Sequence, residues 1–323
     1  MMKPMAEESI APRGGVSVAR PVSLIKHVGY VVRSMRPKQW AKNGIVFMAF
    51  IFSVNIAWKP SDLDSWDHLV LRALITAIAF CMVSGAEYLV NDVRDRDADR
   101  LHPRKSRRPI AAGLVTPAAA YSWALVMFTG GTAVAFALDW RTGVVVIGYM
   151  VAMLAYSYVL KYQVILDVMV IAGGFVLRAM AGAYAIGVPI SPWLYVVTAL
   201  GALFIAITKR RAEVNLLQEG AVDHRATLEL YTPALIDQMT AMVTASTVIA
   251  YALYTFTAEN LPKNHEMMLT IPFVVYGIFR YLYLSLTRNE GGSPEEVLLK
   301  DLPLLITVVA WVVTSMAVLT AYR

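Results

Sequence analysis

The sequence predicts an all-α, polytopic membrane protein with about nine transmembrane helices. Hydrophobic residues make up 58% of the 323 residues, whereas charged residues make up only 16%. The mean hydropathy is +0.55, and long apolar runs recur along the chain. These three observations indicate one helical membrane domain rather than two soluble domains.

The N-terminal segment is expected to lie outside the membrane-spanning bundle. Residues 1–21 mix Pro, Gly, Ser and charged residues, which is typical of a disordered segment. Residues 22–36 carry an apolar stripe at helical spacing, which indicates an amphipathic helix lying at the membrane interface. We expect no cleavable signal peptide, because no short apolar run precedes a small-residue cleavage site. Residues 22–323 would then form a single transmembrane domain.

Apolar segments long enough to cross a bilayer are expected at residues 44–58, 69–90, 118–138, 142–160, 164–187, 191–208, 236–257, 268–287 and 303–321. The first segment is short, and the polar stretch around Trp40 could complete it. The connections at 139–141 and 188–190 are very short, which predicts antiparallel neighbouring helices.

The distribution of basic residues predicts the orientation. Lys and Arg are concentrated in the connections on the N-terminal side of the expected bundle, so this side should be cytoplasmic in a plasma-membrane protein. The net charge of +6 is accounted for by these connections, and no long basic arm indicates nucleic-acid binding. The single cysteine, Cys81, excludes an internal disulfide framework and a cysteine metal cluster.

Carboxylates at helical spacing follow the second apolar run. Asn91, Asp95 and Asp99 are spaced i, i+4, i+8, and Asp92 lies three residues before Asp95. If the helix continues, these side chains share one face, with Glu87 one turn earlier. Neighbouring carboxylates repel each other unless a cation lies among them. An oxygen-only ligand set indicates a hard cation such as Mg²⁺.

A basic cluster comes shortly after these acids and includes Lys105 and Arg108. Carboxylates beside basic residues are the groups that a Mg²⁺–diphosphate requires. The alternative is an ordinary charged loop between two membrane helices, but the periodic acids and the adjacent basic run favour a site.

Further candidates lie at the cytoplasmic ends of other helices. Lys42 and Asn43 could face a cavity, or they could belong to the interfacial anchor around Trp40. Lys161 lies in a connection rich in tyrosine. Arg178 lies well inside an apolar run, so it must face a cavity or a partner. For Arg178, the sequence is equally compatible with phosphate binding and with a structural pairing to another group of the protein.

The connection after the sixth apolar segment begins with Lys209, Arg210 and, three residues later, Glu213. Taken alone, these residues are explained by an i,i+4 pair and by the positive-inside bias. A phosphate-binding role therefore depends on the rest of the chain.

The motif Asn91-Asp92-x-x-Asp95-x-x-x-Asp99, followed by Arg108-Pro109-Ile110, resembles the first aspartate-rich motif of the UbiA superfamily of intramembrane prenyltransferases. The resemblance covers essentially residues 36–321 and implies a UbiA-like bundle with a cytoplasm-facing active-site cavity. Other matching stretches resemble the branch of this superfamily that transfers 5-phosphoribose to decaprenyl phosphate: residues 36–43, 88–95, 108–113, 173–179, 209–213, 271–273 and 280–281. Most relatives carry a second Asp-x-x-x-Asp, whereas this chain has Lys209 and Glu213 there.

The resemblance implies a reaction in which phosphoribosyl diphosphate donates 5-phosphoribose to a polyprenyl phosphate and diphosphate is released, in cell-wall arabinan precursor synthesis. Its cofactor would be Mg²⁺, held by Asn91 and the catalytic Asp92, Asp95 and Asp99. Residues implied to bind the substrates are Lys42, Asn43, Lys105, Arg108, Lys161, Arg178, Lys209, Arg210 and Glu213. The implied partners are both substrates and membrane lipid, with no nucleic acid and with self-association left open.

Two alternatives remain at this point. The first is transfer of a prenyl group from a prenyl diphosphate to an aromatic or other acceptor, since this reaction also expels a Mg²⁺-bound diphosphate. The basic connection after the sixth segment disfavours this alternative. The second is a transporter, which would place polar residues near the bilayer midplane between repeated halves. Most charges here gather at one interface and no repeat is evident.

Overall fold

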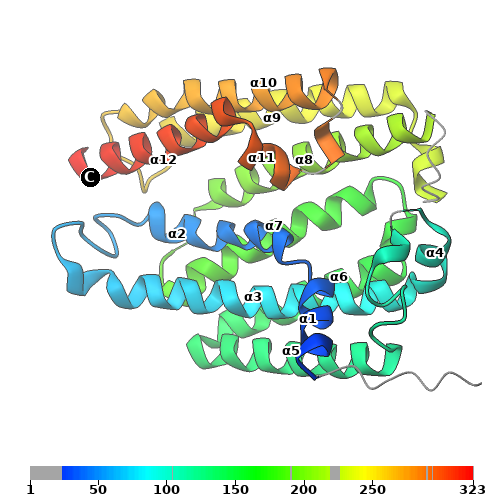
Figure 1. The fold of residues 1–323 in the computed structure, drawn as a ribbon. Coiled ribbons are helices and arrows are strands. Elements are labelled where there is room, and N and C mark those ends of the chain that lie inside the picture. Colours follow the sequence, from blue (N-terminus) through cyan, green and yellow to red (C-terminus); the bar gives the residue numbers. More distant parts are fainter. Residues whose placement is uncertain are drawn as a thin grey trace, which may run out of the picture.

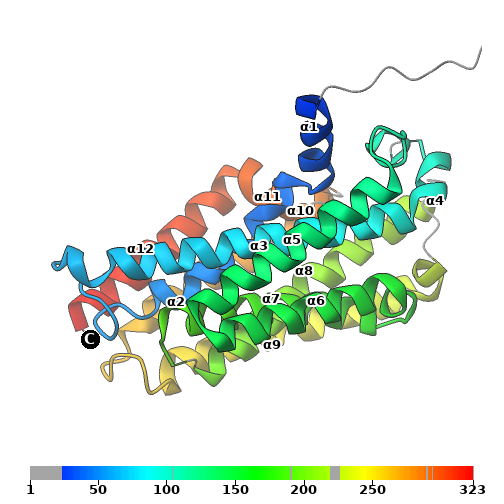
Figure 2. The ribbon, with the colours of Figure 1, turned by 90° about the horizontal axis from the view of Figure 1, so that it is seen from below.

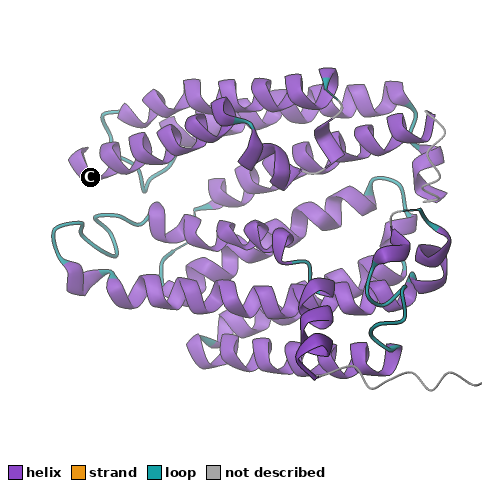
Figure 3. Cartoon of the chain, in the orientation of Figure 1, coloured by secondary structure: helices purple, strands orange, loops and turns teal. Residues whose placement is uncertain are grey.

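The protein is described by a computed structural model that covers residues 24–103, 105–189, 191–218, 226–288, 290–292 and 294–322. Across these residues the chain is helical, and an isolated bridge between Val54 and Trp58 is the only β-type pairing among them (Figure 3). The expected all-α class is confirmed. The segment 1–21, predicted to be disordered, lies outside the described residues.

The described residues contain eight helices that are long and apolar enough to cross a membrane. They run roughly along a common direction, as Figure 1 shows. They are α3 (Asp67–Arg94), α5 (Pro117–Leu138), α6 (Trp140–Tyr158), α7 (Leu166–Ile186), α8 (Pro192–Gln218), α9 (Pro233–Thr257), α10 (Ile271–Thr287) and α12 (Leu302–Tyr322). The chain is therefore an integral, multi-pass membrane protein.

The ninth expected crossing, residues 44–58, is not confirmed. Its place is taken by a 3-10 helix, η1 (Pro37–Phe47), and a short α2 (Met48–Ile51). After Ile51 the chain folds back on itself, because the Trp58 indole N–H donates to the carbonyl oxygen of Phe50 at 2.8 Å. The rings of these two residues also stack, with centroids 4.6 Å apart.

A helix at the N-terminal end of the described chain, α1 (Leu24–Ser34), confirms the helix expected there. It lies across the long helices rather than along them and projects from the bundle (Figure 2). Arg36, between α1 and η1, adopts a left-handed backbone conformation with φ of 55°. This turn changes the direction of the chain between the two elements. Its position at a membrane surface stays a prediction.

Short helices connect the long ones. They are η2 (Leu63–Ser65), α4 (Arg96–Leu101), η3 (Lys105–Arg107), η4 (Leu160–Tyr162), η5 (Ala226–Leu230), η6 (Glu266–Thr270), η7 (Glu290–Gly292) and α11 (Pro294–Lys300). Helix α4 packs against η3, and η4 packs against η5. Three of the candidate site residues lie in these elements: Asp99 in α4, Lys105 in η3 and Lys161 in η4.

Close packing between η1 and α7 depends on a small residue. A Cβ atom added to Gly182 would lie 2.1 Å from the carbonyl oxygen of Val46. Since no side chain fits in that space, only glycine lets η1 approach α7 this closely. Gly187 then ends α7 in a left-handed conformation, which glycine adopts without steric cost.

Candidate functional site

The acidic motif lies where α3 ends. Asp95 interrupts the helix, and α4 begins at the next residue. Backbone hydrogen bonds from the Asp95 amide to Asn91 and from the Asp99 amide to Asp95, at 2.9 and 2.8 Å, nevertheless keep the helical spacing. Asp92 and Asp99 are buried, with 2% and 4% exposure.

Two arginines neutralise the buried carboxylates. Arg36 Nη2 lies 2.5 Å from Asp92 Oδ1. One nitrogen of Arg108 lies 3.2 Å from the same oxygen and 2.7 Å from Asp99 Oδ2. The Arg36 guanidinium also lies over the Tyr88 ring, 4.6 Å from its centroid. Asp92 and Asp99 are therefore held together by a shared guanidinium group.

Asp95 belongs to a second group. The Asn91 side-chain amide donates to Asp95 Oδ2 at 3.0 Å. The Lys161 ammonium donates to Asp95 Oδ1 at 2.8 Å. The four predicted metal ligands thus lie in one region but form two clusters, each with its own basic partners. Each cluster joins residues at helical spacing, i,i+4 for Asn91 and Asp95 and i,i+7 for Asp92 and Asp99.

The donor chemistry of these residues fits Mg²⁺ that is shared with a phosphate ligand. In the described part of the chain, no three acidic, histidine or cysteine side chains converge to form a complete protein cage. Mg²⁺ does not require one, since it usually takes one or two carboxylates and completes its shell with water and substrate phosphates. The paired carboxylates of Asp92 and Asp99 meet that requirement.

Deeper in the bundle, Arg178 is surrounded by protein partners. Its Nε donates to Asn43 Oδ1 at 2.8 Å, its Nη2 donates to the Tyr149 hydroxyl at 2.7 Å, and its Nη1 donates to the carbonyl oxygen of Gly174 at 3.0 Å. Arg178 is 6% exposed. These contacts tie η1 to α6 and α7, so they support the structural alternative for Arg178 and Asn43. Phosphate binding by the pair stays a prediction.

A buried carboxylate lies near this group. Glu87 is 8% exposed, and the Ser157 hydroxyl donates to its Oε1 at 3.3 Å. This hydrogen bond links α3 to α6 within the bundle.

The basic residues expected in a connection lie instead in the last turns of α8, which continues to Gln218, and they form a third cluster. Arg210 is 3% exposed, and its Nη1 lies 2.5 Å from Glu213 Oε2. Its Nε lies 3.9 Å from Asp167 Oδ2. The Tyr231 hydroxyl donates to the other Asp167 oxygen at 2.6 Å. Burial and this hydrogen bond raise the pKa of Tyr231 well above its usual value, so the hydroxyl remains a donor at neutral pH.

The remaining candidates occupy partly exposed positions. Lys42 lies in η1, Lys105 in η3 and Lys209 in α8, and all three are partly buried.

Several residues that contact the predicted site were not expected from the spacing: Arg36, Tyr149, Ser157, Thr227 and Tyr231. The sequence indicates these residues only weakly. An arginine beside a proline, or a tyrosine in a connection, commonly occurs for reasons unrelated to a functional site.

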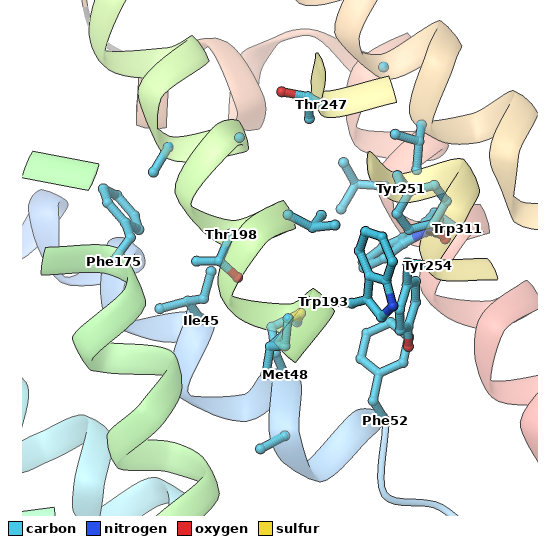
Figure 4. A pocket seen from close by; sticks show the side chains of 18 of the residues that line it. Ile45, Met48, Phe52, Phe175, Trp193, Thr198, Thr247, Tyr251, Tyr254 and Trp311 are labelled. Carbon is cyan, nitrogen blue, oxygen red and sulfur yellow. Dashed lines mark hydrogen bonds between the residues drawn. The ribbon is translucent and has the colours of Figure 1, made fainter. Parts of the chain in front are cut away.

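A large apolar cavity of about 550 Å³ lies between η1 and α2 on one side and α7 to α12 on the other. Figure 4 shows Ile45, Met48 and Phe175 at one part of its wall, and aromatic side chains at another. Those aromatic residues are Phe52, Trp193, Tyr251, Tyr254 and Trp311. The Trp311 indole N–H donates to the Tyr251 hydroxyl at 2.7 Å, which fixes part of this wall.

The cavity and the charged clusters are adjacent rather than merged. The predicted charged site residues are absent from the lining of this cavity. Phe175 connects the two regions, because it lines the cavity while the Arg178 guanidinium lies 5.4 Å from its ring centroid. The expected single cytoplasm-facing cavity is therefore not confirmed. The fold defines an intramembrane protein in which buried clusters of paired charges lie beside an apolar cavity.

Comparison with known proteins identifies the class more closely. The UbiA prenyltransferase family matches residues 45–293. The chain is 33% identical over 298 residues to decaprenyl-phosphate phosphoribosyltransferase of Mycolicibacterium smegmatis, covering 89% of this chain and 91% of that protein. It is 34% identical over 287 residues to the protein of the same name from Corynebacterium glutamicum, covering 87% and 84% of the two chains.

Solved structures show the same fold. A UbiA homolog from Archaeoglobus fulgidus bound to GPP and Mg²⁺ aligns with a TM-score of 0.66 at 20% identity, covering 90% of this chain and 100% of that chain. A UbiA homolog from Aeropyrum pernix K1 aligns with a TM-score of 0.58 at 14% identity, covering 90% and 98%. The chain belongs to the UbiA prenyltransferase family, a family of membrane-embedded transferases.

Proposed function

We propose that this enzyme transfers 5-phosphoribose from phosphoribosyl diphosphate to a polyprenyl phosphate, with release of diphosphate. The observation that carries the proposal is the similarity to relatives named decaprenyl-phosphate phosphoribosyltransferase over nearly the full length of both chains. The geometry supports it, since buried carboxylates beside Arg36, Arg108 and Lys161 suit a bound metal–diphosphate.

The end of α8 supports phosphoribosyl transfer over prenyl transfer. The resemblance to UbiA prenyltransferases implies a second Asp-x-x-x-Asp there, whereas this chain has Lys209, Arg210 and Glu213. A donor that carries a 5-phosphate in addition to its diphosphate needs more positive charge than a prenyl diphosphate does. Buried Arg210 is held at the start of α7 by Asp167 and by Glu213 on its own helix, and we assign this basic group to the additional phosphate.

Asp92 and Asp99, together with Asp95 and Asn91, would hold Mg²⁺ on the diphosphate. The bound ion would stabilise the negative charge that develops on the leaving group. Arg108 and Lys105 lie in the same connection and would bind diphosphate oxygens directly. Lys42 and Lys209 would contribute positive charge to the remaining phosphates.

In the proposed reaction, a phosphate oxygen of the lipid forms a bond to ribose C1 as the bond between C1 and the diphosphate oxygen breaks. The bonding electrons leave with diphosphate, and positive charge develops on the ribose ring, as in other glycosyl transfers. The acceptor is already anionic near neutral pH, so no strong general base is required. The apolar cavity lined by Phe175 and Trp193 would take part of the polyprenyl chain.

We place the charged clusters and the N-terminus on the cytoplasmic side of the plasma membrane, because Lys and Arg are concentrated in the connections on that side. The product would be an activated pentose on a lipid carrier, a precursor for cell-wall arabinan. Residues 22–323 would function as one transmembrane domain.

A direct assay tests the proposal. Purified protein in detergent is incubated with Mg²⁺, labelled phosphoribosyl diphosphate and decaprenyl phosphate, and we expect a labelled lipid that also carries phosphate. A parallel reaction without Mg²⁺ should give no product. Lack of the labelled lipid, together with product from a prenyl diphosphate and an aromatic acid, would contradict the proposal and establish prenyl transfer.

A further inference from the structure

Residues 226–231, which comprise η5 and Tyr231, form a strap across the start of α7 and the short helix η4. The Thr227 hydroxyl donates to the carbonyl oxygen of Lys161 at 2.9 Å. The Tyr231 hydroxyl donates to Asp167 and accepts from the Ile165 amide at 2.9 Å. Thr227 is 1% exposed and Tyr231 is 3% exposed. Both hydroxyl groups are therefore buried against the backbone that carries Lys161.

Lys161 continues this chain of contacts into the acidic motif. Its backbone carbonyl is held by Thr227, and its ammonium group donates to Asp95 at 2.8 Å. The lysine is 7% exposed. A flexible lysine side chain usually samples many rotamers, so a fixed position requires a fixed backbone. The strap provides that backbone constraint.

The backbone between Lys161 and α7 is strained. Ile165 has φ of 71° and ψ of −48°, a conformation that a β-branched residue rarely adopts. Strained residues of this kind persist only where the surrounding structure fixes them, and they cluster at functional sites. The Tyr231 hydroxyl binds the Ile165 amide directly. The strap thus holds the chain in the conformation that directs η4 toward α3.

From these contacts we propose that Tyr231 and Thr227 are positioning residues, which set the turnover of the enzyme by holding Lys161 against Asp95. The inference rests on the proposed function, because it assigns Lys161 to the diphosphate side of the site. Neither hydroxyl contacts the reacting atoms. Each acts through the placement of the Lys161 ammonium group.

A purely structural role of the strap is the competing explanation. Leu228 is 2% exposed and packs in an apolar cluster with Val168 and Ile236, so the strap also contributes to stability. If the strap has only a structural role, loss of either hydroxyl should lower the stability of the fold by the same amount whether or not Lys161 is present. A positioning role predicts that the effect on turnover disappears once Lys161 is absent.

A double-mutant cycle separates the two roles. The variants are Tyr231→Phe, Lys161→Met and the double variant, assayed in detergent with Mg²⁺, phosphoribosyl diphosphate and decaprenyl phosphate. We expect Tyr231→Phe to lower kcat by about tenfold or more, with a smaller change in KM. A small displacement of the Lys161 ammonium group in the site should lower turnover steeply. In the Lys161→Met background the same change should alter kcat by less than about twofold.

The matched control is Tyr195→Phe. Tyr195 lies near the start of α8, at the opposite end of that helix from Arg210. Its loss removes a tyrosine hydroxyl without affecting the strap, so kcat should stay near the wild-type value. Equal losses for Tyr195→Phe and Tyr231→Phe, or additive effects in the cycle, would overturn the inference.

A second pair of variants keeps the inference testable if Tyr231→Phe fails to fold. Thr227→Val removes the hydroxyl at nearly constant shape and should lower kcat, whereas Thr227→Ser keeps the hydroxyl and should restore most of it. Equal activity of these two variants would count against positioning. Inactive wild-type protein in the same assay would instead refute the proposed function, so the two failures are distinguishable.

Discussion

Asp92 accepts contacts from two arginines that are far apart in the sequence, Arg36 and Arg108. A carboxylate with 2% exposure is unfavourable unless opposite charge and hydrogen bonds compensate for its lost hydration. The arginines provide this compensation before any substrate binds. The Asp97 side chain, five residues later, is 92% exposed and has a long contact of 3.6 Å to Arg100.

This difference predicts a sharp contrast between two neighbouring substitutions. Asp92→Asn should lower turnover by about 100-fold or more, because a carboxylate that would hold Mg²⁺ on the leaving diphosphate is lost. Asp97→Asn, as the matched control, should retain near wild-type turnover. Initial rates of labelled-lipid formation test this, with thermal unfolding measured for both variants. A fully active Asp92→Asn variant would remove the acidic motif from the reaction.

The sequence predicted that the acidic residues lie close together better than it predicted how they pair. The spacing of Asn91, Asp92, Asp95 and Asp99 correctly indicated acids that are close together. It could not show that Asp95 interrupts the helix and turns toward Lys161, because that contact depends on tertiary packing between α3 and η4. The roles of Arg36 and Tyr231 were hidden for the same reason.

At the scale of elements, η1 is the part of the fold that hydropathy described least well. The length of an apolar run indicates that a segment is buried, but it does not indicate which type of helix the segment forms. For this reason residues 44–58 were expected to cross the membrane. Eleven residues of η1 instead form a 3-10 helix, which advances about 2.0 Å per residue and is uncommon at this length. Contact with Gly182 of α7 and the hydrogen bond between Asn43 and Arg178 hold it in place.

Gly182→Ala should therefore displace η1 from α7 and lower the stability of the protein. The added Cβ would lie 2.1 Å from a backbone oxygen that cannot rotate away, and overpacking of this kind costs about 1–3 kcal/mol. Gly173→Ala, on the same helix, is the control, since its Cβ would meet no atom within 4 Å. Thermal unfolding in detergent should show a lower Tm for Gly182→Ala alone. Equal Tm values would show that η1 moves without cost.

At the scale of the whole molecule, composition alone was sufficient for the class of fold. Eight of the nine expected crossings are present as long helices, because each depends mainly on the length and apolarity of a local segment. The cavity was only partly predictable. An active-site cavity was expected, but the wall of the apolar cavity combines residues from Ile45 to Trp311, and no local pattern predicts which distant helices will enclose a space.

If the cavity receives the lipid chain, then filling it should affect long acceptors most. Gly201 lines the cavity, and a Cβ atom added to it would meet no atom within 4 Å. Gly201→Phe should raise KM for decaprenyl phosphate by about tenfold, equivalent to about 1.4 kcal/mol, with a smaller effect on geranyl phosphate. Gly148→Phe is the control, because Gly148 is exposed on α6 and also has open space around it. Equal KM values for both variants would place the chain elsewhere.

The internal neutralisation of Asp92, Asp95 and Asp99 has a consequence for handling the protein. Since Arg36, Arg108 and Lys161 already balance these carboxylates, we expect folding not to depend on a bound ion, unlike small domains whose ligands form their only core. Extraction with chelators should yield an intact bundle that recovers full activity when divalent salt is restored. Purification in EDTA followed by reconstitution is therefore a practical route to samples for titration.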